Sequence, residues 1–219
     1  MATLLITGAN RGIGFNIAKQ CSERGDEVIA VCRRSSEDLD ALGVEVLDGI
    51  DVSSSRSVAA LAESLGGRRI DWLVNNAGIL DRTTLGELDF DSVEQQFRIN
   101  AVAPLRVTEA LLDTLTAGSK VFIITSRMGS IDDNTSGGSY GYRMSKAAVN
   151  MAGKSLSVDL KEPGIAVFLL HPGWVSTDMT GGTGIPVSES AAGLIERMDE
   201  LDISQTGTFW HQEGYQLPW

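Results

Sequence analysis

Residues Thr7-Gly8-Ala9-Asn10-Arg11-Gly12-Ile13-Gly14 join an apolar run, Thr3 to Thr7, to a segment of helical period, Ile13 to Arg24. Glycines in such a strand-to-helix turn allow a tight bend and a close approach of the backbone to a ligand. The first turn of the helix offers unpaired N–H groups to an anion. The segment therefore predicts the phosphate-binding loop of a dinucleotide site, although its Gly-x-x-x-Gly-x-Gly spacing differs from the commoner Gly-x-Gly-x-x-Gly.

Short apolar runs rich in valine and isoleucine alternate with longer helical segments along the rest of the chain. Such runs are typical of strands buried on both faces of a parallel sheet, and the segments between them are long enough for crossover helices. We expect a single domain over residues 1–219, a Rossmann-like three-layer α/β/α sandwich with a mainly parallel, seven-stranded sheet. The expected strands are Thr3–Thr7, Glu27–Cys32, Val44–Leu47, Ile70–Asn75, Val121–Thr125, Ile165–Leu170 and Thr208–Trp210, with further helices at Ser54–Leu65 and Tyr142–Leu160.

The composition indicates a folded chain with an acidic surface. Hydrophobic residues make up 42% and charged residues 21% of the 219 residues, which are ordinary values for a globular protein with one core. The formal net charge of −11 disfavours nucleic acids and anionic membranes as partners, because both are bound mainly by clustered Lys and Arg. No stretch approaches the roughly 18 apolar residues of a membrane span, and the first apolar run is too short for a signal peptide.

Cys21 and Cys32 have neither the density of a disulfide framework nor the spacing of a metal site. We therefore expect no metal and a cytoplasmic location.

Tyr142 and Lys146 stand four residues apart in a segment of strong helical character, so they share one helix face. An ammonium about 4 Å from a phenol, at an effective dielectric near 20, favours the phenolate by about 4 kcal/mol, or roughly three pKa units. Since a free tyrosine has a pKa of about 10, the pair is a candidate general acid and base near neutral pH. Tyr140 competes for this role, but Met144, four residues after it, offers no charge.

Ser126 directly follows the apolar run Val121–Thr125, at the sheet edge where ligands of open α/β folds bind. Its hydroxyl is a candidate donor to a substrate oxygen, and Ser130 is the competing serine. Farther upstream, Pro104 lacks the N–H that would bond the carbonyl of Asn100, so we expect that carbonyl to be free inside a helical segment.

Six motifs together resemble those of the short-chain dehydrogenases/reductases, in the same order and over nearly the whole chain. They are Thr7 to Gly14, Asn75-Asn76-Ala77-Gly78, Asn100, Ser126, Tyr142-x-x-Ser145-Lys146 and Pro172-Gly173. The run His171 to Met179 and the segment Gly214 to Trp219 look most like the C-factor and Sniffer-type carbonyl reductases of this family. One departure is the distance from Ser126 to Tyr142, which is longer than usual, and the extra residues fall in the loop Gly129 to Gly138.

The resemblance implies an oxidoreductase that moves a hydride between a nicotinamide cofactor and a carbonyl or alcohol carbon of a small-molecule substrate. It implies Tyr142 as general acid and base, with Lys146 and Ser126 beside it and Asn100 holding a water that links the lysine to solvent. The cofactor contacts it implies are Gly8, Asn10, Arg11, Gly12, Ile13, Gly14, Asn76, Ala77, Gly78, Tyr142, Lys146, Pro172, Gly173, Val175 and Thr177. The alternative is a non-catalytic nucleotide-binding signalling protein of the same fold.

The end of the second expected strand, Val31-Cys32-Arg33-Arg34, favours NADP(H) over NAD(H). An NAD-selective site commonly places an acid there, roughly 20 residues after the glycine loop, to bind the ribose 2′-hydroxyl. Here Arg33 is suited to a 2′-phosphate, and Arg11 is placed to approach from the other side. Asp51-Val52 resembles the family's pair at the adenine edge, although Asp51 is also placed to cap the next helix.

The resemblance also implies assembly. In many members of the family the outer faces of the helix that carries the tyrosine and of the preceding helix pair across a two-fold axis. The small residues Ala147, Ala148, Ala152 and Gly153 allow close helix approach, so we expect a homodimer or a higher homo-oligomer.

Overall fold

The glycine loop follows the central strand of a seven-stranded sheet. The computed structural model describes residues 1–219, and its strands are all parallel in the order β3-β2-β1-β4-β5-β6-β7. The strand order changes direction between β1 and β4, and such a switch point is where dinucleotides bind in open α/β sheets. The strands are β1 (Thr3–Thr7), β2 (Glu27–Val31), β3 (Glu45–Leu47), β4 (Trp72–Asn75), β5 (Lys120–Ile124), β6 (Ala166–His171) and β7 (Thr208–His211).

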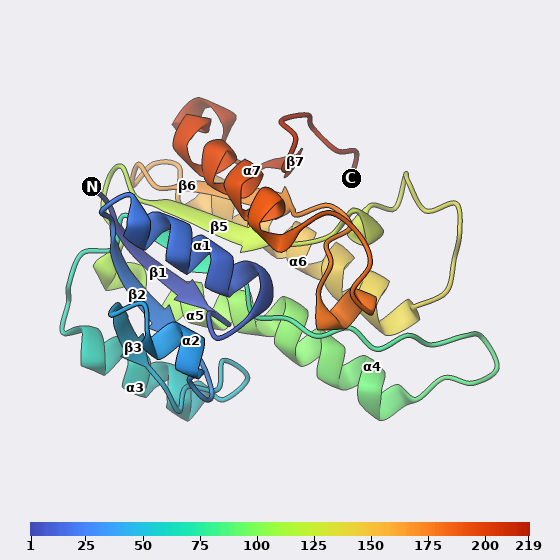
Figure 1. The fold of residues 1–219 in the computed structure, drawn as a ribbon. Coiled ribbons are helices and arrows are strands. Elements are labelled where there is room, and N and C mark those ends of the chain that lie inside the picture. Colours follow the sequence, from blue (N-terminus) through green and yellow to red (C-terminus); the bar gives the residue numbers. More distant parts are fainter.

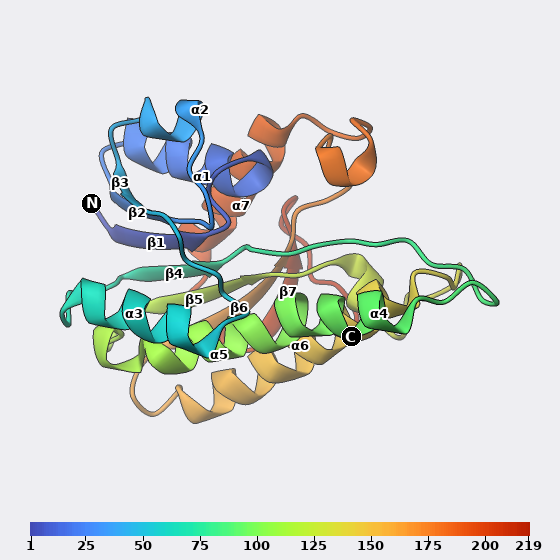
Figure 2. The same ribbon diagram turned by 90° about the horizontal axis from the view of Figure 1, so that it is seen from below.

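Helices cover both faces of the sheet and complete the predicted three layers (Figure 1). One face carries α1 (Gly12–Glu23), α2 (Glu37–Asp40) and α7 (Val187–Glu200), and the other carries α3 (Ser55–Leu65), α4 (Phe90–Phe97), α5 (Ala103–Ala110) and α6 (Tyr140–Asp159), as Figure 2 shows. Each interface buries its own apolar cluster, one of 22 residues under α1 and α7 and one of 18 residues under α3, α5 and α6. The predicted sandwich is therefore confirmed.

A π-helix, Arg98–Val102, separates α4 from α5. The N–H of Ala103 bonds the carbonyl of Arg98, five residues back, and Pro104 then stands in the first turn of α5. A proline inside a helix removes one backbone donor, and a wider turn accommodates that loss. The long helical segment that contains Asn100 is thus interrupted at the position where a free carbonyl was expected.

Helix α6 begins at Tyr140, two residues before the expected start. Ser139 precedes it in the left-handed conformation, with φ 47° and ψ 47°, and Gly137 and Gly138 also have positive φ. The chain therefore reverses sharply before the helix, and Tyr142 lies inside the first turn instead of at its edge.

No helix of the structure combines the length and the apolar character that crossing a membrane requires.

Candidate active site

The glycine loop is shaped by close backbone contacts. A Cβ at Gly14 would lie 2.4 Å from the carbonyl oxygen of Gly8, and a Cβ at Gly8 would lie 2.9 Å from the Cα of Ala77. Gly8 and Gly12 also have positive φ angles of 69° and 58°, which side chains disfavour. At Gly12 an added Cβ would meet only the Thr177 side chain, at 3.7 Å, so the surface of the loop is open there.

No side chain of α1 or of its N-cap residue accepts a hydrogen bond from the free N–H groups of the first turn. Its N-cap residue, Arg11, makes no side-chain cap, and no acidic residue stands in the first turn. By contrast, Ser54 and Asp89 cap α3 and α4 with their side chains. The uncapped N–H groups beside an open glycine surface fit the pyrophosphate of a dinucleotide.

Asn76 fastens the glycine loop to the end of β4. Its Nδ2 donates to the carbonyl oxygens of Thr7 at 2.9 Å and Gly8 at 3.1 Å. The backbone N–H groups of Asn76 and Ala77 donate in turn to the Thr7 hydroxyl, at 3.1 and 3.2 Å. The side chain of Asn76 is therefore occupied in holding the cofactor loop, which is a positioning role.

The predicted catalytic side chains Ser126, Tyr142 and Lys146 meet at the carboxyl end of β5 and are all buried. Lys146 Nζ donates to the carbonyl of Ile124, the last residue of β5, at 2.9 Å, and lies 5.7 Å from the centroid of the Tyr142 ring. The Tyr142 hydroxyl interacts with the side chain of Ser126. The structure thus brings together the three groups that the spacing in the sequence suggested.

Burial dominates the ionisation of this pair. It raises the pKa of Tyr142 to about 12, against a smaller lowering by the neighbouring side chain of Ser126. It also lowers the pKa of Lys146 to about 8. The expected lowering of the tyrosine pKa by the lysine is therefore wrong, because desolvation penalises the phenolate and the ammonium lies over the ring, bonded to a backbone carbonyl.

The two competing residues lie elsewhere. Tyr140 is 36% exposed, whereas Tyr142 is 8% exposed. Ser130 is buried, but its hydroxyl donates to the carbonyl of Trp219 at 3.1 Å and accepts from the Asp133 N–H. Ser130 is therefore committed to holding the loop after β5, and the geometry favours Ser126 and Tyr142.

Asn100 is buried in the π-helix and joins it to the segment after β4. Its side chain accepts from the N–H of Ile79 and donates to the carbonyl of the same residue, both at 2.8 Å, and donates to Ser145 Oγ at 3.0 Å. Ser145 donates to the carbonyl of Tyr142 at 2.8 Å. An added Cβ on Gly78 would be 3.2 Å from Asn100 Oδ1 and 3.8 Å from Lys146 Nζ, so these groups surround one point.

Sequence reasoning assigned no role to Gly129 or to the hydroxyl of Ser145. A Cβ at Gly129 would lie 2.7 Å from the backbone carbon of Lys146, so the turn after Ser126 packs directly on α6. The glycine stands three residues after Ser126 in the sequence, but its partner is far along the chain. No local pattern could therefore have identified the contact.

The arginines predicted to meet a 2′-phosphate flank the glycine loop and β2. Arg33 is exposed just after β2, and its charge acts on Asp51. Burial raises the pKa of Asp51, but hydrogen bonds from Ser53 and the charges of Arg33 and Arg106 outweigh this effect and leave that pKa below its usual value. Asp51 Oδ1 accepts from the N–H of Ser53 at 2.9 Å, and Ser54 is the side-chain cap of α3.

Arg11 forms an ion pair at 3.1 Å with Asp178, in the segment after β6. Both side chains are largely exposed. This partner of the glycine loop was not predicted, since the two residues are far apart in the sequence.

Three other predicted cofactor contacts, Asn10, Ile13 and Val52, each make a contact within the protein. The Asn10 carbonyl accepts from Ser36, the Ile13 side chain packs against the core under α1, and the Val52 carbonyl accepts from Arg106.

The lid segment (residues 174–185) folds back on itself beyond β6. Val175 is buried and pairs with Ile185, while the N–H of Thr177 donates to Thr180 Oγ1 at 3.0 Å. Pro172 is buried with its carbonyl bonded by Ser190, and Gly173 has a positive φ of 86°. Pro172, Gly173, Val175 and Thr177 thus lie together at the sheet edge that holds Ser126, and their predicted cofactor contacts stay predictions.

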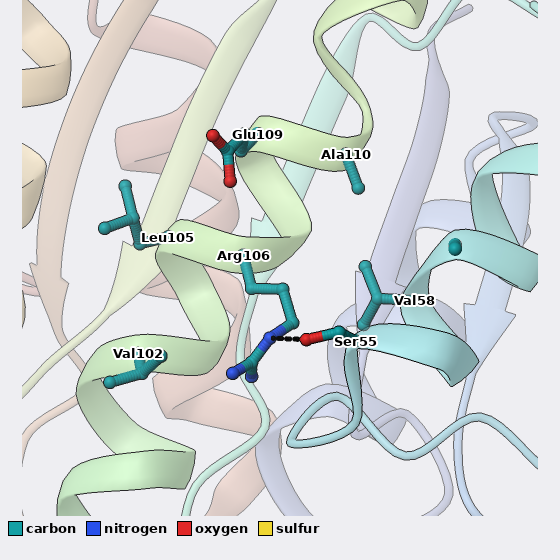
Figure 3. Close-up of a pocket in the computed structure, with 8 residues that line it drawn as sticks. Ser55, Val58, Val102, Leu105, Arg106, Glu109 and Ala110 are labelled. Carbon is teal, nitrogen blue, oxygen red and sulfur yellow. Dashed lines mark hydrogen bonds between the residues drawn. The ribbon is translucent and has the colours of Figure 1, made fainter.

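A cavity of about 390 Å³ lies between α3 and α5, away from these groups (Figure 3). Val58, Val102 and Leu105 line it, and Arg106 Nε donates to Ser55 Oγ beside it at 3.2 Å. Neither Ser126, Tyr142 nor Lys146 borders the cavity. The candidate active site is therefore identified by its chemistry and its place in the sheet, and this cavity belongs to the outer helix layer.

Several known proteins are similar to this chain in sequence and in fold. The dehydrogenase of 1-hydroxy-2-glutathionyl-2-methyl-3-butene from Rhodococcus sp. (strain AD45) is 44% identical over 226 aligned residues, covering 100% of both chains. C-signal of Myxococcus xanthus is 46% identical over 154 residues, covering 68% of this chain and 93% of that protein. The carbonyl reductase Sniffer of D. melanogaster has a TM-score of 0.93 at 29% identity, with 100% of both chains covered.

A carbonyl reductase from Pseudomonas aeruginosa PAO1, solved in complex with NADP, has a TM-score of 0.89 at 35% identity and is also covered in full, as is this chain. The family model described as short chain dehydrogenase matches residues 2–185. These similarities agree with the order of the six motifs and with the geometry at the end of β5. The chain therefore belongs to the short-chain dehydrogenase/reductase family of oxidoreductases.

Proposed function

We propose that the site transfers a hydride between NADP(H) and a carbonyl or alcohol carbon of a small molecule, with Tyr142 as general acid and base. One observation carries this proposal. Ser126, Tyr142 and Lys146 converge in a buried position at the carboxyl end of the sheet, next to a glycine loop with uncapped N–H groups. The names of two neighbours, a dehydrogenase of a hydroxylated compound and an NADP-bound carbonyl reductase, support the same chemistry.

The chain's own groups divide the work. The loop Gly8 to Gly14 would hold the pyrophosphate, and Arg33 with Arg11 would hold the 2′-phosphate. NADPH supplies the hydride when bound. Ser126 donates a hydrogen bond to the substrate oxygen, and Tyr142 delivers a proton to that oxygen. At neutral pH the phenol of Tyr142 holds its proton, which is the form that the reduction of a carbonyl requires.

Lys146 would hold the nicotinamide ribose, and its neighbour Asn100 would complete the proton path. The buried lysine amino group has a carbonyl partner but no carboxylate within ion-pair distance. Burying an amino group in this way lowers the stability of the fold. A role in catalysis accounts for a lysine at this buried position.

A non-catalytic nucleotide-binding signalling protein is the second candidate function. The name of the Myxococcus relative, C-signal, is the observation that favours it. The intact, buried set of Ser126, Tyr142 and Lys146 favours catalysis, because a protein that only binds a nucleotide has no need to bury a phenol beside an amino group.

We also propose a homodimer and a cytoplasmic location. Exposed apolar side chains recur at near-heptad spacing from α4 to the turn after α5, namely Phe90, Phe97, Leu105 and Leu112, and a second stripe on α6 consists of Met144, Met151 and Val158. These two helical runs lie side by side on one face of the sheet (Figure 2). We define them together as the apolar helix face.

The proposed cytoplasmic location rests on the cysteines. Cys21 and Cys32 are both buried free thiols, which suits a reducing compartment.

A spectrophotometric screen of NADPH oxidation against aldehydes, ketones and quinones tests the proposed reaction. We expect turnover in the parent and a loss of about 10²-fold to 10⁴-fold in Tyr142→Phe, which lacks the general acid. The same variant should bind NADPH within a few-fold of the parent, whereas Lys146→Met should lose turnover and also bind NADPH more weakly. NADPH should bind at least about tenfold tighter than NADH, because Arg33 meets a phosphate in one and a hydroxyl in the other.

Near-parent turnover in Tyr142→Phe would overturn this mechanism. Bound NADPH that no tested compound oxidises, with no effect of Tyr142→Phe, would favour the signalling alternative.

A further inference from the structure

Two side chains from the segments that follow β4 and β6 are in contact. The guanidinium of Arg82, in the loop after β4, lies 5.5 Å from the centroid of the Trp174 ring, in the lid segment after β6. Strand β5 lies between β4 and β6 in the sheet. The segments that follow β4 and β6 therefore leave the sheet on either side of the end of β5, where Ser126 lies, and the contact joins these two segments. We call this contact the Arg82–Trp174 strap.

Trp174 is held rigidly in its half-exposed position. Its indole Nε1 donates to Thr183 Oγ1 at 3.1 Å, and its carbonyl accepts from the N–H of Ile185 at 2.8 Å. Gly184 has a φ of 120°, and a Cβ there would lie 2.1 Å from the carbonyl oxygen of Trp174. The exposed aromatic face is thus fixed by the fold of the lid segment, and 50% of the residue remains exposed.

Arg82 has no oxygen partner, in contrast to Arg11, Arg127 and Arg143. Arg11 pairs with Asp178, and Arg127 pairs with Asp133. Arg143 donates to Ser136 Oγ and to the carbonyls of Gly137 and Met128. Arg82 forms no ion pair and no hydrogen bond, and its only recorded partner is the indole ring.

Three carboxylates of the loops at this end of the sheet have other partners. Asp81 accepts from the hydroxyl of Ser92 at 2.6 Å, and Asp178 and Asp133 are engaged by Arg11 and Arg127. The chain as a whole has a formal net charge of −11 and repels anions. Arg82 is thus a cation with free donors in an acidic protein, and it contacts the lid segment.

We propose that the Arg82–Trp174 strap recognises a carboxylate on the substrate. The inference rests on the proposed function and adds a substrate class, namely carbonyl or alcohol compounds that carry an anionic group at a distance from the reacting carbon. Arg82 binds the carboxylate with its free N–H donors, and the rigid indole of Trp174 packs against the apolar part of the molecule. Arg82 is thus a specificity-determining residue that takes no part in the chemical step.

Matched substrates separate this role from catalysis. We would measure kcat and KM for a series of ω-oxo carboxylates of increasing chain length and for their uncharged methyl esters, with NADPH, in parent, Arg82→Gln and Arg82→Lys. At the chain length that spans the site, the parent should prefer the acid to its ester by at least about tenfold in kcat/KM. Arg82→Gln should abolish this preference by raising KM for the acid, with kcat and the ester kinetics unchanged. Arg82→Lys, which keeps the charge, should retain part of the preference.

Arg56→Gln is the matched control, since Arg56 is an exposed arginine on α3, away from the strap, and should leave the preference intact. A parent without preference at any chain length, or an Arg82→Gln variant that changes acids and esters equally, would overturn the proposal while leaving the hydride transfer standing. Absence of turnover with acids and esters alike, in an enzyme that is active in the wider screen, would overturn the substrate class alone, whereas absence of turnover in that screen as well would overturn the proposed function.

Discussion

Position 14 has no room for a methyl group, because a Cβ there would lie 2.4 Å from the carbonyl oxygen of Gly8. That oxygen is already held by Asn76 Nδ2 at 3.1 Å, so the loop cannot move away freely. We predict that Gly14→Ala destabilises the protein by about 1 to 3 kcal/mol through overpacking. It should also weaken NADPH binding by at least about tenfold, since the loop that holds the phosphates must shift. Urea unfolding and fluorescence titration with NADPH measure the two effects.

Gly25→Ala provides the comparison for that experiment. Gly25 has a φ of 92°, but an added Cβ would meet nothing within 4 Å. This variant should lose stability through backbone strain and bind NADPH as the parent does. Parent-like NADPH affinity in Gly14→Ala would contradict our account of the loop.

Tyr142 gives the protein a distinct alkaline behaviour. Burial raises its pKa from 10.0 to about 12. Between these values the unfolded chain releases a proton that the folded protein keeps, so folding is favoured fully below the lower value and loses this contribution as the pH rises toward the upper one. We predict an extra fall in stability of up to about 1.4 kcal/mol per pH unit across this window in the cofactor-free protein.

Urea unfolding of the parent, Tyr142→Phe and Tyr140→Phe at a series of alkaline pH values checks this prediction. The profile of Tyr142→Phe should be flatter than that of the parent, and Tyr140→Phe, which changes an exposed ring, should follow the parent. Parallel profiles in all three proteins would show that the phenol of Tyr142 is not desolvated.

The residue patterns predicted which groups meet, and they could not predict how those groups ionise. The helical spacing of Tyr142 and Lys146 correctly placed both on one helix face, and Ser126 lies where its strand predicted. The predicted direction of the tyrosine pKa was wrong, because the sequence does not show that the amino group bonds the carbonyl of Ile124 or that the phenol is buried. The pair Arg11–Asp178 was also missed, since nothing local links its two members.

At the scale of the elements, the start of α6 stores backbone strain. Ser139 is the only residue other than glycine with a positive φ, 47°, and this conformation costs roughly 1 to 2 kcal/mol for a residue with a Cβ. Its side chain makes no cap to the helix. We predict that Ser139→Gly stabilises the protein by up to about 1 kcal/mol, measured by urea unfolding.

Ser139→Ala should give no such gain, because alanine has the same Cβ. A stabilised Ser139→Ala, or a destabilised Ser139→Gly, would mean that the serine hydroxyl and not the backbone sets the energy of this turn.

Strands were easier to predict than the exact course of the helices. The apolar runs gave seven parallel strands with ends shifted by one or two residues, such as β2, which stops at Val31 instead of Cys32. Pro104 indicated a break near Asn100, but the sequence could not specify that the chain widens into a π-helix over Arg98–Val102. Helix α7 was not singled out, although its buried residues Ala191, Leu194, Ile195 and Met198 recur at helical spacing.

For the whole molecule, the apolar helix face predicts association. We expect light scattering to find a dimer at micromolar concentrations, because exposed apolar stripes on neighbouring helices are a typical interface between copies of one chain. Met151→Glu and Leu105→Glu should both give monomers. Ile203→Glu, which changes an exposed apolar residue outside the apolar helix face, should remain a dimer. A parent that is monomeric throughout this range would contradict the proposal.

The position of β1 in the middle of the sheet has a consequence for biosynthesis. β1 is the first strand of the chain, yet it pairs on one side with β2, through Thr3 and Glu27, and on the other with β4, through Leu4 and Trp72. At about 5 to 20 residues per second, several seconds pass between the synthesis of β1 and that of β4. During that interval an apolar strand edge has no partner, and such edges promote aggregation. The arrangement that centres the glycine loop in the finished protein therefore leaves one edge of β1 exposed to aggregation until β4 has been synthesised.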